Sequence, residues 1–157
     1  MCAAATICRY YGTSINIDTA HGNLTTSQHN VHTLAACPGG NGLEACQVIY
    51  TYTGKNGTSY ENSLSASATM LYFGGTTPIY TGWFHYNNAQ PVFPGHAMVL
   101  CGYIFDTVSL DFTYEFRDSD PYDQSEVYII STFNASTVSY YSLGESYVWH
   151  LSIYNWN

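Results

Sequence analysis

The stretch PVFPGHAMVLCGY, residues 91–103, places a single histidine directly before a run of apolar residues. Residues 96–105 are short, apolar and aromatic, and Pro and Gly precede them, which is typical of a strand that enters a core. A lone histidine at such a place is usually structural. Because an imidazole at a strand end is also suited to acid–base chemistry, His96 is the first candidate for a functional residue.

Four further short, aromatic segments follow Gly75, separated by Pro, Gly, Asn and Asp, and each is a predicted strand. They are residues 77–86 (TPIYTGWFHY), 112–121 (FTYEFRDSDP), 126–133 (EVYIISTF) and 147–156 (YVWHLSIYNW). Because sequential strands usually pair, the histidine strand and residues 112–121 are expected to be antiparallel neighbours.

The sequence before Gly75 favours helices. Residues 2–11 contain three consecutive alanines and precede Gly12, and residues 60–75 end in two glycines, a common way to stop a helix. Residues 42–52 fit a helix or a strand. Helices first and strands second predict one α+β domain, in which an antiparallel sheet packs against N-terminal helices.

Composition excludes several classes of partner. Arg9, Lys55 and Arg117 are the only basic residues against 11 carboxylates, so the formal net charge is −8 and a nucleic-acid partner is not expected. No apolar run is long enough for a membrane span. His29 and His32 form a pair, but no Cys or carboxylate pattern completes a zinc site, so neither a metal nor a cofactor is predicted. With 16 Tyr and one Lys, the composition favours a secreted or cell-surface protein.

Cys2 opens the first predicted helix. The first turn of a helix lowers a thiol pKa, because unpaired N–H groups and the positive end of the helix dipole stabilise the thiolate. A histidine on a facing strand can pair with this thiolate, and a carboxylate on the next strand can fix the tautomer of the imidazole. Asp118 and Asp120 end that next strand, and strand alternation alone does not choose between them.

The motifs resemble, in the same order, those of the papain-like cysteine peptidases, in the bacterial branch that includes the staphopains. The matching segments are MCAAATICRYYG (1–12), FGGTTPIYTGWF (73–84), GHAMVLCGY (95–103) and FRDSDPY (116–122), and the tail 147–156 is similar to the closing strand of these domains. The resemblance implies a papain-like α+β fold over residues 1–157, with the nucleophile at the N-terminus of a central helix.

The resemblance also implies a site. By position Cys2 is the nucleophile, His96 the general base and acid, and Asp120, directly before Pro121, the orienting carboxylate; Asp118 is the alternative. The expected activity is hydrolysis of a peptide or protein substrate through an acyl-enzyme. The family's oxyanion-hole glutamine has no counterpart before Cys2, and losing such a donor costs about 10²–10³ in rate. The other expectation is therefore a catalytically impaired structural or binding protein of the cell surface or of filaments, which self-associates.

Five cysteines are an odd number, so four disulfide-bonded cysteines would leave one free thiol. Cys37 and Cys46 flank a Gly-rich turn and are predicted to be bridged. Cys8 and Cys101 lie among apolar residues, where inert thiols are common. Cys2 is expected to be the free thiol.

Overall fold

The computed structural model describes residues 2–16, 42–74, 77–87, 90–118, 126–142 and 144–157. Its helices are α1 (Cys2–Tyr10), α3 (Gly42–Thr53) and α4 (Ala66–Phe73). Its strands are β1 (Thr58–Tyr60), β2 (Ile79–Asn87), β3 (Gln90–Phe105), β4 (Asp111–Asp118), β5 (Glu126–Thr132), β6 (Ser139–Ser142) and β7 (Glu145–Tyr154).

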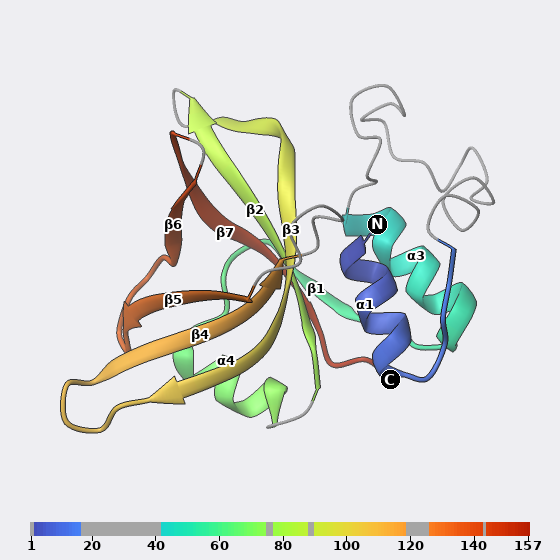
Figure 1. The fold of residues 1–157 in the computed structure, drawn as a ribbon, viewed down its shortest axis with the longest axis horizontal. Helices are drawn as coiled ribbons and strands as arrows, with labels where there is room; N and C mark the ends of the chain where they lie inside the picture. Colours follow the sequence, from blue (N-terminus) through green and yellow to red (C-terminus); the bar gives the residue numbers. More distant parts are fainter. Residues whose placement is uncertain (1, 17–41, 75–76, 88–89, 119–125, 143) are drawn as a thin grey trace.

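The strands form one 7-stranded sheet in the order β1-β7-β2-β3-β4-β5, with β6 paired to β7. Every pair is antiparallel. Figure 1 shows α1 and α3 side by side against one face of the sheet, and α4 away from them beside its other side. The predicted pairing of the histidine strand with the next strand is confirmed, because β3 pairs with β4.

Two apolar clusters lie on the two faces of the sheet. The helix-side cluster joins α1 and α3 to buried sheet residues such as Tyr80 and Val99. The aromatic cluster includes Met98 and Leu100 of β3 with many of the largest buried rings, Trp83 and Trp149 among them. Because side chains alternate along a strand, Val99 faces the helices while Met98 and Leu100 face the rings.

The expected papain-like α+β arrangement is wrong. Antiparallel strands dominate the described residues, and the three helices there are short, of 9, 12 and 8 residues. The physical reason is that the central strands bury both faces, so the β-branched and aromatic residues of the second half form most of the structure. None of the helices in the described ranges is long and apolar enough to cross a membrane.

Local signals explain where the helices end. Gly12, just after α1, has a φ of +84°, a left-handed conformation that suits glycine, as the sequence predicts. The helix predicted over residues 60–75 is too long, because Tyr60 belongs to β1 and pairs with Ser152 of β7. The helix begins only after Ser65, whose side chain caps it by accepting a hydrogen bond from the Ala68 N–H, and it ends at Gly74. The ambiguous residues 42–52 are helical.

Candidate catalytic site

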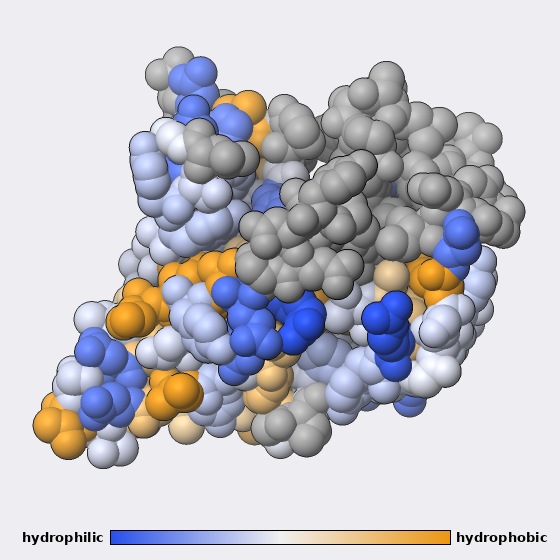
Figure 2. Space-filling view, in the orientation of Figure 1, coloured by the Kyte–Doolittle hydropathy of each residue, from blue (hydrophilic) through white to orange (hydrophobic). Residues whose placement is uncertain are grey.

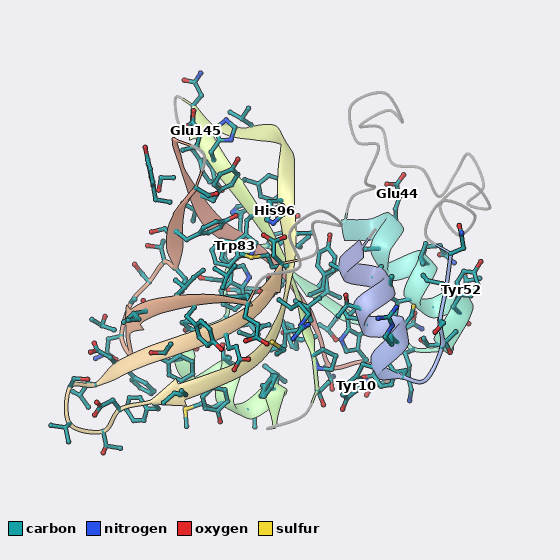
Figure 3. All side chains as sticks on the ribbon, in the orientation of Figure 1. Tyr10, Glu44, Tyr52, Trp83, His96 and Glu145 are labelled. Carbon is teal, nitrogen blue, oxygen red and sulfur yellow. The ribbon has the colours of Figure 1, made fainter. Side chains whose placement is uncertain are left out.

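His96 lies on β3 directly opposite Trp83 of β2, and the two labelled side chains are neighbours in Figure 3. The register of the β2–β3 pair shifts just beyond this point, between Trp83 and His85. Gly95 is required beside it, because a Cβ there would lie 2.6 Å from both the Trp83 carbonyl oxygen and the Phe84 ring. The absence of a side chain at Gly95 thus lets β2 and β3 approach closely beside His96.

The imidazole of His96 is held by Asp118. Its Nε2 lies 2.8 Å from Asp118 Oδ1, and the two side chains are 29% and 18% exposed. The contact follows from the register, since Asp118 pairs with Met98, two residues along β3 from His96. An ionised carboxylate only accepts, so Nε2 carries the proton and donates it. Nδ1 is then the nitrogen that can gain or lose a proton.

The partly buried hydroxyl of Tyr140 lies near this carboxylate. The pKa of the Tyr140 hydroxyl is raised, mainly by burial and further by the negative charge of Asp118. The Tyr140 ring meets Trp83 edge-on at 5.0 Å and stacks on Tyr147 at 5.3 Å between centroids. A partly buried aromatic neighbour lowers the local dielectric constant, which strengthens a charge-assisted hydrogen bond. Tyr140 and Tyr147 were not found by sequence reasoning, because one tyrosine among 16 gives no signal of its own.

Cys2 is the first residue of α1, as predicted. The Cys2 side chain is not among the side chains that the structure describes, so the expected contact of the sulfur with the imidazole stays a prediction. Ala3 and Ala4, in the first turn, belong to the helix-side cluster with Val99, and Ala97 packs against the same cluster. Helix α1 therefore contacts β3 through the helix-side cluster, against which Ala97, the residue after His96, packs. His96 itself alternates onto the face that carries Trp83.

The third predicted member of the site, Asp120, also lies outside the described residues. Asp118, the alternative, is the carboxylate that contacts His96. Its neighbour Arg117 forms an ion pair with Glu126, with Nη2 3.0 Å from Oε1, on the exposed surface.

A scan of protein-family models and a search of the curated proteins find no match to this chain. The resemblance to papain-like peptidases therefore stays a prediction from its motifs, and only the geometry around His96 bears on function.

The other histidines are weaker candidates for a functional site. Nδ1 of His85 is buried and has no hydrogen-bond partner, and the ring meets Tyr147 edge-on at 5.7 Å. His29 and His32 lie outside the described residues. Across the described ranges, no three His, Cys, Asp or Glu side chains come together as a metal site would require.

The described thiols are not activated. Cys46 is free in the structure, contrary to the predicted bridge, and Cys37 lies outside the described residues. Burial raises the pKa of both Cys8 and Cys46 to about 11. Cys101 is exposed, and its thiol donates to the Glu115 carbonyl oxygen at 3.4 Å.

The buried thiol of Cys8 predicts a loss of stability in alkali. Its folded pKa of about 11 exceeds the ordinary value of 9.0, so between these values the unfolded chain has lost a proton that the folded chain keeps. Stability from this group is complete below pH 9.0 and falls as the pH rises toward 11. We expect Cys8→Ala to flatten the slope of unfolding free energy against pH by up to about 1.4 kcal/mol per unit. Urea unfolding across this range measures it. The pKa of Cys101 is also raised, by partial burial and by the nearby Glu115, but by less than that of Cys8, so Cys101→Ala should flatten the slope less, and an equal flattening would contradict the assignment.

Proposed function

We propose that the protein is a cysteine peptidase in which Cys2 is the nucleophile, His96 the general base and acid, and Asp118 the orienting carboxylate. The observation that carries the proposal is the 2.8 Å contact from Asp118 Oδ1 to His96 Nε2. This contact leaves Nδ1 for proton transfer, and a carboxylate behind the imidazole stabilises the imidazolium. Helix α1 begins at Cys2 and packs on the opposite face of β3 from His96, so the pairing of the Cys2 thiol with His96 is the part of the proposal that the experiment below tests.

The proposed reaction has two halves. The Cys2 thiolate attacks the carbonyl carbon of a peptide bond, a C–S bond forms, and the C–N bond breaks as the proton on His96 Nδ1 passes to the leaving amine. His96 then takes a proton from water, whose oxygen attacks the thioester. The C–S bond then breaks, the carboxylic acid leaves, and the thiolate remains beside the imidazolium that His96 became when it took the proton from water. The composition, poor in Lys and rich in Tyr, supports a proposed location outside the cell or on its surface.

A second candidate is a self-associating structural or binding protein. Ile104, Tyr128 and Ile130 are more than half exposed on β3 and β5, and Val108 is exposed on the β3–β4 turn. Figure 2 shows apolar surface over this part of the molecule. Strand β5 also ends the sheet order, and such edge strands favour pairing with another chain.

The test that separates the two candidates is alkylation of Cys2 by iodoacetamide at about pH 6, followed by mass spectrometry. An unpaired thiol with a pKa near 8.5 is less than about 1% thiolate at this pH, whereas one paired with His96 is largely ionised. Since nucleophilicity falls with pKa, the net loss in His96→Ala should be about tenfold in rate. Equal rates in the wild type and His96→Ala would exclude the pair and favour the second candidate.

Two matched variants identify the carboxylate in the same experiment. Asp118→Asn should slow alkylation less than His96→Ala, because an amide can still orient the ring. Asp120→Asn should leave the rate unchanged. A larger effect from Asp120→Asn than from Asp118→Asn would assign the orienting role to Asp120, as the motif resemblance implies.

A further inference from the structure

A pocket of about 410 Å³ lies between β1, α4, the last residue of β7 and residues 135–136. This volume falls in the range of roughly 300–1,000 Å³ that is usual for small-molecule sites. The register separates it from the candidate catalytic site. His96 pairs with Trp83, and Trp83 pairs with Trp149 of β7. Tyr154, which lines the pocket, lies five residues further along β7, about 17 Å away at the usual rise per residue.

Three tyrosines form the aromatic walls of the pocket: Tyr60, Tyr72 and Tyr154. The rings of Tyr72 and Tyr154 lie 4.3 Å apart between centroids with a tilt of 39°. The pKa of Tyr154 is raised by burial, then by the nearby Tyr72 and by a hydrogen bond with it, and finally by Tyr60. The three phenols are therefore close enough to act on one ligand together.

The remaining wall is polar and uncharged. Asn62, Ser63 and Ser136 add an amide and two hydroxyls, and Leu64 and Ala68 add apolar surface. None of the described residues that line the pocket carries a formal charge. An ionic ligand would thus lose its hydration without gaining a counter-ion, which is costly. The pocket suits a neutral ligand that has both an apolar face and many hydrogen-bonding groups.

Strand pairing, a side-chain hydrogen bond and a helix cap hold the walls of the pocket in place. Thr58 of β1 pairs with Tyr154, and Tyr60 pairs with Ser152. The Ser152 hydroxyl donates to the Asn62 carbonyl oxygen at 2.7 Å, which fixes the segment after β1. The N-cap of Ser65 then sets where α4 begins, and α4 carries Tyr72. The tyrosines are positioned before any ligand binds, which lowers the entropic cost of binding.

We propose that this pocket binds a neutral saccharide. A sugar ring offers C–H groups to the tyrosine faces and hydroxyls to the Ser, Asn and Tyr groups around them. The net charge of −8, and a wall without Lys or Arg among the described residues, disfavour uronic acids and sulfated sugars. A proline-rich peptide also stacks on tyrosines, but its few hydrogen-bonding groups would leave most of the polar wall unpaired.

Saturation-transfer NMR tests the proposal with maltose, cellobiose, lactose and N,N′-diacetylchitobiose as probes. At least one should receive saturation on its ring protons. Tyr60→Ala should weaken its binding at least about fivefold, which corresponds to the roughly 1 kcal/mol that one stacked aromatic ring contributes. Tyr60 is 47% exposed, so this variant should stay folded, as circular dichroism checks. Ala68→Phe, which fills the pocket, should also block binding.

Two control variants locate the binding. Tyr141→Ala removes a tyrosine that is 74% exposed on β6 and outside the pocket, and should bind the sugar normally. His96→Ala should also bind normally, because the pocket is separate from the candidate catalytic site. Absence of transfer to all four sugars, equal binding by the Tyr60→Ala and Ala68→Phe proteins, or preferential binding of a proline-rich peptide would each overturn the proposal.

Discussion

Replacing the proposed nucleophile, Cys2→Ala, should abolish peptide hydrolysis, with a fall in kcat of at least about 10⁴-fold. Without the sulfur no acyl-enzyme forms, and His96 with Asp118 has no nucleophile to activate. Cleavage of fluorescently quenched, denatured casein measures the effect.

Cys101→Ala is the matched control for the loss of a thiol. Cys101 is exposed and lies on β3 as His96 does, and its thiol donates to the Glu115 carbonyl oxygen. Its removal should leave kcat within about twofold, as expected for a surface change away from the site. Equal cleavage by the wild type and Cys2→Ala would contradict the proposed chemistry, even if His96 were still required.

The elements that carry the candidate site were largely predictable from local sequence. Three alanines before Gly12 predict α1, and the apolar run after His96 predicts β3. Both signals are local. Glycine adopts a positive φ without steric strain, and an apolar segment bounded by turn residues forms a strand. The pairing of β3 with β4 follows from the short connection between them.

The balance of the fold was not predictable in the same way. Strands that bury both faces have no alternation of polar and apolar residues, so their extent cannot be read from periodicity. Residues 60–75 show the problem at shorter range. Tyr60 forms part of β1 because β7 pairs with it, a contact between segments about 90 residues apart, and helix propensity contains no information on this partner.

The choice between the two aspartates depended on register. Asp118 and Asp120 have the same parity, so alternation treats them alike. The structure aligns Asp118 with Met98, two residues from His96, and this offset brings its carboxylate to Nε2. The β3–β4 register also shifts between Leu100 and Gly102, close to the Met98–Asp118 pair. This shift depends on tertiary contacts, and no residue type in the sequence predicts it.

Trp83 should be the side chain whose loss costs the most stability, because it is fully buried at the centre of the aromatic cluster. Its ring meets Phe116 at 5.1 Å and Trp149 at 5.8 Å between centroids. Its Nε1 donates to the Thr81 hydroxyl at 2.8 Å, and that hydroxyl donates to the Met98 carbonyl oxygen at 2.9 Å. Trp83→Ala leaves a large cavity and removes the donor to Thr81, so we expect a loss of about 3–5 kcal/mol.

Urea unfolding followed by circular dichroism measures this loss, with Tyr141→Ala as the control, expected within about 0.5 kcal/mol of the wild type. Trp83→Phe separates the two contributions, because it keeps an aromatic ring but removes the indole N–H. Its loss should be intermediate. A loss below about 1 kcal/mol in Trp83→Ala would contradict full burial, since cavities of this size in a packed core cost more. Trp83 lies directly opposite His96. Such a result would therefore also mean that Trp83 does not rigidly support the His96–Asp118 geometry.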